Sequence, residues 1–157
     1  MEINGLPLHP LIVHAVVIFV PLGALSAVLF ALMPRWRWLL RWPTLVLALG
    51  AVVVTRIAVI SGNDLKKQRD LGGAQLARHM DLATWLERSV WAFAVVAVLA
   101  CWVLPYVVPL KDREDRLSPA ASLTMVANVL LPIAAATVLV LAVLTGDAGA
   151  KAVWKIS

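Results

Sequence analysis

Four long apolar stretches dominate this chain and leave it few ways to fold. They cover about residues 10–33, 43–60, 84–108 and 120–144. Each is about long enough for a helix to cross the roughly 30 Å hydrocarbon core of a bilayer. Hydrophobic residues make up 62% of the 157 residues, and the mean hydropathy is +0.89, whereas soluble domains are about 45–50% apolar. The sequence therefore predicts an all-α, polytopic membrane protein, a four-transmembrane-helix bundle that forms a single domain over residues 1–157.

The longest polar segment lies between the second and third stretches, over residues 61–84. It opens with the turn signal Ser61-Gly62-Asn63-Asp64, which is typical of a loop. From Gln75 to Arg88 apolar side chains recur at helical spacing. This amphipathic segment before the third helix is either an interfacial helix or the upper end of the third membrane helix. The sequence shows no convincing internal repeat.

Basic residues give the predicted orientation. The two short loops carry Arg35, Arg37, Arg41, Lys111, Arg113 and Arg116. These charges lie close to helix ends, where the positive-inside rule is most reliable. We therefore expect the short loops in the cytoplasm and both termini on the extracytoplasmic side of a bacterial plasma (inner) membrane. Arg35, Arg37 and Arg41 are expected to serve as headgroup anchors beside an interfacial tryptophan belt.

The less common polar residues collect on the other side of the membrane. That side carries His9, His14, Arg56, Asp64, His79, Asp81, Glu87 and Asp147. His14 and Arg56 each lie four residues inside an apolar stretch, so both are roughly 6 Å deep.

An arginine at such a depth costs about 2.5–3.5 kcal/mol on insertion scales unless it snorkels or is paired. Glu87 is the natural partner, and Asp64 or Asp81 could take its place. We therefore expect a structural polar layer formed by His14, Arg56 and Glu87. The end of the fourth stretch, with Asp147, is expected to cover it.

The histidines make a b-type haem the cofactor to consider. Such a haem needs one or two axial histidines on facing helices. His14 could supply one ligand and His79 or His9 the other, with Arg56 at a similar level to His14. A straight third helix would place His79 about ten residues above Ser89, some 15 Å outside, so pairing with His14 would need the segment to fold back, whereas His9 lies nearer that level. His9, His14, His79, Asp64 and Asp81 are of the residue types that bind divalent metals, but no close spacing selects them, since His9 and His14 are five residues apart and do not share a helical face.

No pattern for nucleophilic catalysis, phosphate binding or dinucleotide binding appears, and the mixed charges of residues 111–116 do not favour nucleic acid. The sequence favours a non-catalytic accessory subunit whose extracytoplasmic histidine site binds a partner or a redox cofactor. A haem electron carrier and a small-solute or ion transporter acting as an oligomer remain as alternatives. Expected partners are the lipid bilayer, a larger membrane or redox complex, or further copies of the chain.

The opening segment, Gly5 to His14, resembles that of the bacterial membrane family called domain of unknown function twenty-two thirty-one. Members look like small proteins of about four transmembrane helices that open with His-Pro-aliphatic-Val-His, and the continuation Ala15-Val16-Val17 looks like the actinobacterial version. The resemblance implies a Ser/Thr-Gly turn at Ser61-Gly62, a following histidine at His79 and a glycine-containing turn at Thr145-Gly146 and Gly149. It implies no activity, although relatives that accompany redox proteins favour electron transfer.

Overall fold

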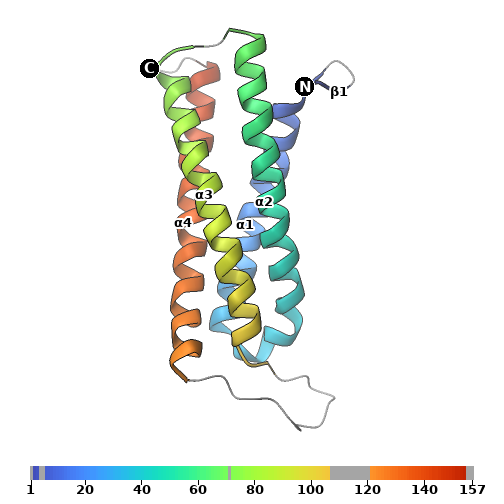
Figure 1. Cartoon of the computed structure of the whole chain (residues 1–157), viewed down its shortest axis with the longest axis vertical. Coiled ribbons are helices and arrows are strands. Elements are labelled where there is room, and N and C mark those ends of the chain that lie inside the picture. Colours follow the sequence, from blue (N-terminus) through green and yellow to red (C-terminus); the bar gives the residue numbers. More distant parts are fainter. Residues whose placement is uncertain (1, 4–5, 71, 107–120, 155–157) are drawn as a thin grey trace.

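Four long helices packed side by side make up the protein in the computed structural model (Figure 1). The structure describes residues 2–3, 6–70, 72–106 and 121–154. The helices are α1 (Leu8–Leu32), α2 (Arg37–Gln68), α3 (Ala74–Val103) and α4 (Ala121–Trp154). Two-residue strands β1 (Glu2–Ile3) and β2 (Leu6–Pro7) pair antiparallel ahead of α1, and the 3-10 turn η1 (Pro34–Trp36) joins α1 to α2. The predicted all-α, four-helix membrane fold is confirmed.

The outside of the bundle is apolar over most of its length. All four helices are long and apolar enough to cross a membrane, so the chain is a multi-pass membrane protein. Large apolar side chains such as Val17, Leu99, Trp102 and Val143 are more than half exposed. A soluble protein would present such a surface to water at a large cost, whereas lipid tails cover it in a bilayer.

The helices extend well beyond the apolar stretches. Helix α2 has 32 residues, which is roughly 48 Å at 1.5 Å per residue. The predicted turn at Ser61–Asp64 is wrong, because these residues lie inside α2. A helix already formed in the membrane continues without a new nucleation step, and Leu65 to Gln68 are good helix formers. Gln75 to Arg88 lies within α3, which confirms the upper end of the third helix over an interfacial helix.

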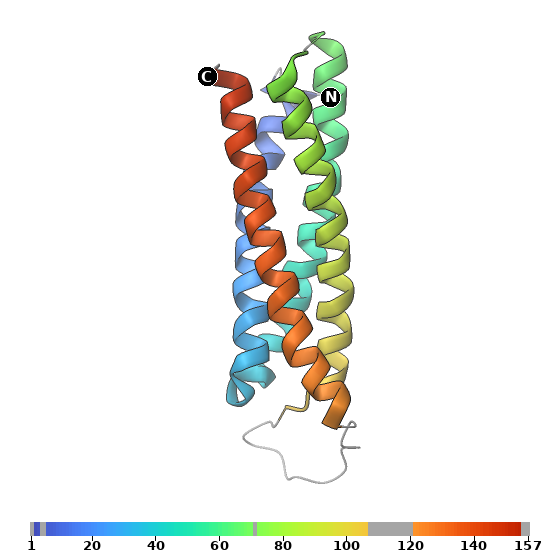
Figure 2. The ribbon, with the colours of Figure 1, turned by 90° about the vertical axis from the view of Figure 1, so that its left-hand side faces the viewer.

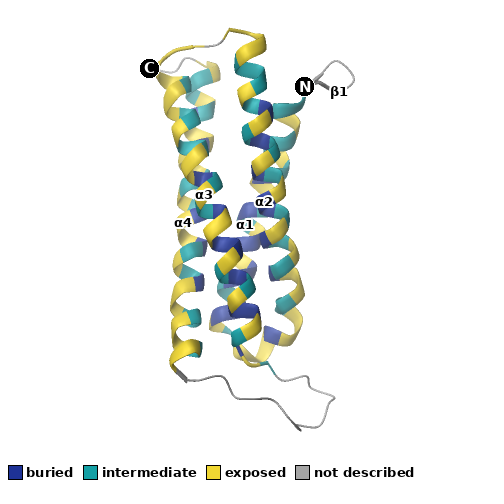
Figure 3. Cartoon of the chain, in the orientation of Figure 1, coloured by how far each residue is buried: buried dark blue, intermediate teal, exposed yellow. Residues whose placement is uncertain are grey.

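Each helix packs against two neighbours. Helices α1 and α3 both contact α2 and α4 and lie diagonally across the bundle, as the two views together show (Figure 2). The buried residues are concentrated in the lower half and middle of Figure 3, where Phe30, Phe93, Leu104 and Leu131 are fully buried. The upper end, at the α2–α3 turn, encloses small side chains instead. Large apolar side chains therefore fill the interior of the lower bundle, while small and partly polar side chains line the upper interior.

Arg37 closes the lower end of the bundle from inside. It is 3% exposed, so the prediction that it anchors in the headgroups is wrong. Its guanidinium donates to the carbonyls of Phe30 (3.0 Å), Ala31 (2.9 Å) and Pro105 (3.3 Å) and to Oδ1 of Asn128 (2.8 Å). The physical reason is that α1 ends beside it, and the last carbonyls of a helix have no intrahelical donor.

Candidate functional site

His9 lies in the first turn of α1 and is held by α2. Its Nδ1 is 2.9 Å from the carbonyl oxygen of Ala58. Because a carbonyl can only accept, Nδ1 carries the hydrogen and Nε2 of the neutral ring has a free lone pair. Ser61 donates from Oγ to the same carbonyl at 3.1 Å and lies 3.4 Å from His9 Nδ1. Gly62 is close beside the ring, since a Cβ there would lie 3.0 Å from His9 Cε1.

His79 lies near the start of α3 and is held in the same manner by α4. Its Nδ1 is 2.9 Å from the carbonyl oxygen of Thr145, so this ring too is protonated at Nδ1 and has a free Nε2 lone pair. Gly149 is beside it, and a Cβ at that position would lie 3.0 Å from both Cε1 and Nδ1 of His79. Both imidazoles are partly buried at the same end of the bundle.

The two imidazole rings face one another across the bundle. Their centroids are 6.4 Å apart and their planes are inclined by 77°, although α1 and α3 are diagonal helices. The structure pairs His79 with His9, which the depth estimate from the sequence places nearer the level of His79, and not with His14. Helices α2 and α4 both continue past the apolar stretches, so the bundle still has four walls at the level of His79, and His9 lies there.

The walls around this pair are small and partly polar. Ala58, Ser61 and Ala148 are buried there, and Gly62 and Gly149 beside the rings are partly buried. Two buried hydroxyls, Oγ1 of Thr55 and Oγ1 of Thr145, have no hydrogen-bond partner among the residues that the structure describes. Since buried polar groups almost always have partners, these two hydroxyls are available to a bound group.

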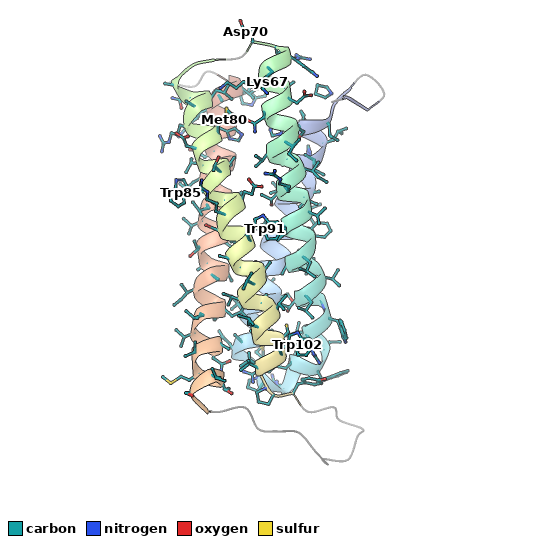
Figure 4. All side chains as sticks on the ribbon, in the orientation of Figure 1. Lys67, Asp70, Met80, Trp85, Trp91 and Trp102 are labelled. Atoms are coloured by element: carbon teal, nitrogen blue, oxygen red, sulfur yellow. The ribbon has the colours of Figure 1, made fainter. Side chains whose placement is uncertain are left out.

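An open pocket lies between the ends of α2 and α3 at the same end of the molecule. It has a volume of about 540 Å³, and its lining consists of Asn63, Lys66, Lys67, Asp70 and Met80. Figure 4 labels three of these side chains where α2 and α3 approach their connecting turn. Met80 is next to His79 in the chain, so the pocket lies near the histidine end of the bundle.

Arg56 and Glu87 join α2 to α3 below the histidines. Nη1 of Arg56 donates to Oε1 of Glu87 at 2.9 Å, with the two side chains 57% and 13% exposed. This pairing agrees with the sequence-based prediction. His14 does not complete the expected layer: it is exposed, and its Nδ1 bonds the carbonyl of Pro10 in its own helix at 2.7 Å. The reason is that His14 lies five residues after His9 and so faces away from the bundle interior.

The acidic residues expected near the layer have local partners or face outward. Asp64 accepts from Nε2 of Gln68 at 2.9 Å, and Asp147 pairs with Lys151 at 2.9 Å. Asp81 is exposed. In the described part of the chain, no group of three or more His, Cys, Asp or Glu side chains is arranged to hold a metal ion.

Sequence reasoning missed the backbone carbonyls of Ala58 and Thr145 that hold the imidazoles. It assigned Ser61-Gly62 and Gly149 to turns, whereas Gly62 and Gly149 lie inside α2 and α4, four residues after each carbonyl and beside the rings. The backbone carbonyl has no sequence signal. The four-residue spacing from a buried small residue to a glycine, found in both α2 and α4, is the signal that could have indicated them.

One family model matches nearly the whole chain. It is described as predicted membrane protein (DUF2231) and covers residues 5–157. No curated protein and no solved structure matches the chain.

Proposed function

The chain belongs to this family of predicted membrane proteins, and we propose that it binds one b-type haem with His9 and His79 as the two axial ligands. The observation that carries the proposal is the matched state of the two rings. Each donates from Nδ1 to a backbone carbonyl, which is the arrangement that orients metal-binding histidines and presents Nε2 to the metal.

The spacing of the rings supports a shared metal. A metal bound by both Nε2 atoms at the roughly 2 Å of metal–imidazole bonds holds the ring centres about 6–6.5 Å apart, and the observed value is 6.4 Å. Haem iron suits a two-histidine set because the porphyrin supplies the other four nitrogens. A bare divalent ion prefers three or four protein ligands, and the described residues offer only these two.

The surroundings support a large planar group. Small residues line α2 and α4 at the level of the rings, and the unpartnered hydroxyls of Thr55 and Thr145 could bond to it. Lys66 and Lys67 in the open pocket would offer positive charge to the haem carboxylates at the aqueous end.

His9 and His79 would hold the haem, which would supply one-electron transfer, so the protein would act as a non-catalytic electron-transfer subunit. We place it in a bacterial plasma membrane beside a redox partner, with the histidine end outside. An impermeant amine reagent applied to intact cells should then label Lys67. Labelling of Lys111 without Lys67 would reverse this orientation.

Titration of haem into the purified protein in detergent tests the ligand assignment. Wild type should bind one haem per chain with a low-spin, six-coordinate spectrum. His9→Ala and His79→Ala should each lose that spectrum, while His14→Ala, the matched control at an exposed histidine, should retain it. Absence of binding by wild type, or loss only in His14→Ala, contradicts the proposal. Copper found in place of haem also contradicts it.

A further inference from the structure

The two histidines are held by two helical hairpins that repeat the same arrangement. His79 follows His9 by 70 positions, and both donate to a carbonyl of the next helix. Thr145 follows Ala58 by 87 positions, and Gly149 follows Gly62 by the same number. The hairpin α1–α2 therefore offers a histidine, a carbonyl and a glycine, and the hairpin α3–α4 offers the same three in the same places.

The buried face of α3 repeats that of α1 at the separation of 70. The buried residues of α3 are Leu86, Val90, Phe93, Ala94, Ala97, Ala100 and Cys101. The residues 70 positions earlier are Val16, Val20, Gly23, Ala24, Ala27, Phe30 and Ala31, and all of them are buried in α1. The separation of 70 comes from His9 and His79 alone. The matching burial in α1 and α3 is therefore independent evidence for the repeat.

Helix α4 repeats α2 at the separation of 87. Its buried residues in the described chain are Leu131, Ala135, Val138, Thr145 and Ala148. Their counterparts 87 positions earlier, Thr44, Ala48, Ala51, Ala58 and Ser61, are all buried in α2. The residue types differ while burial agrees, which explains why the sequence shows no repeat.

The packing of the helices has the same symmetry. Helix α1 contacts α2 and α4, α3 contacts the same two, and the most extensive contacts are those within each hairpin. A two-fold rotation about the long axis of the bundle places α1 on α3 and α2 on α4. This rotation exchanges the α1–α2 contact with α3–α4 and the α1–α4 contact with α2–α3. The His9 and His79 rings, as symmetry counterparts in contact with one another, lie on either side of this axis.

We infer that the histidine site is composed of two equivalent half-sites, one from each hairpin, and that Gly62 and Gly149 are its positioning residues. The ligand of the pair is that of the proposed function, on which this inference rests. Each glycine allows the histidine of the neighbouring helix to approach the backbone closely enough to reach the carbonyl one turn away. Ligand binding therefore depends on both glycines to a similar extent.

The Arg56–Glu87 pair lies outside this symmetry. The counterpart of Arg56 is Val143, and that of Glu87 is Val17. The α2–α3 contact has an ion pair where the α1–α4 contact has two exposed valines. The ion pair thus belongs to the α2–α3 contact alone and is part of neither half-site.

Imidazole NMR of protein labelled with ¹⁵N-histidine tests the half-sites without any ligand. Gly62→Ala should shift the His9 ring signals and Gly149→Ala the His79 signals. Gly146→Ala is the matched control on α4, because nothing lies within 4 Å of a Cβ there, and it should shift neither. The signals of exposed His14 should stay in place in all three variants, which shows that the fold persists.

Haem titration of the same variants completes the test. Gly62→Ala and Gly149→Ala should each weaken binding by about 10- to 100-fold, the range for groups that orient metal ligands, while Gly146→Ala should bind like wild type. Effects at only one glycine, or ring signals unmoved in both variants, overturn the inference. Wild type that binds no haem overturns the proposed function instead, and the ring signals still decide whether the half-sites exist.

Discussion

Arg37→Ala should destabilise the protein strongly. The side chain is almost fully buried and donates to three carbonyls and one amide oxygen. Its removal leaves the carbonyls of Phe30 and Ala31 and the amide of Asn128 without this donor. Each buried group that loses its partner costs about 1–3 kcal/mol. Taking the low end for three groups gives about 3 kcal/mol, or roughly 150-fold in the unfolding equilibrium.

The matched control is Arg35→Ala. Arg35 is exposed and lies 5.9 Å from the centre of the Trp36 ring, a contact worth about 0.5–1 kcal/mol at an exposed site. Unfolding in mixed micelles by added dodecyl sulfate, followed by circular dichroism, measures both variants. Arg37→Lys should recover part of the loss, because an ammonium has no planar fork to reach four acceptors. Equal stability of Arg37→Ala and Arg35→Ala would refute the role of Arg37 as an internal tie between helix ends.

Three further predictions concern packing in the bundle. Arg56→Gln and Glu87→Gln should show a coupling of about 0.6–1.7 kcal/mol in a double-mutant cycle, the range for hydrogen bonds between membrane helices, and strict additivity would show that the pair contributes nothing. Gly50→Ala should cost about 1–3 kcal/mol, because the new Cβ would overlap Cε1 of Phe19. Gly146→Ala meets nothing within 4 Å and should be neutral or stabilising by up to about 1 kcal/mol; equal effects would contradict the packing of α1 on α2. Cys101 is 1% exposed, so a maleimide should label it only after unfolding, and rapid labelling of the folded protein would contradict its burial.

Counting residues from the ends of the apolar stretches gave the correct relative depth of two residues on neighbouring helices. Arg56 and Glu87 were placed at one level from their positions in the chain, and the structure has them 2.9 Å apart. The same counting separated His79 from His14 and put His9 nearer the level of His79, but it did not predict that the bundle continues up to that level. Helices α2, α3 and α4 continue beyond that level, and His9 at the start of α1 is the residue that His79 meets.

Other features depend on contacts that composition does not encode. From the sequence, Arg37 is expected at the membrane interface. It is buried because the carbonyls at the end of α1 lie beside it and accept its hydrogen bonds. The repeat of the two hairpins is hidden because burial is repeated while residue types are not, as in Phe30 and Ala100. The four spans were predictable because length and hydrophobicity alone decide them.

The most direct test of the haem site is the visible spectrum and haem content of the protein purified from bacterial membranes after expression with haem supplied. The account predicts about one haem per chain with a low-spin spectrum that sharpens on reduction, and loss of the haem in the double variant of His9→Ala and His79→Ala. Wild-type protein that is folded and purified without a Soret band, or haem retained by the double variant, would contradict it.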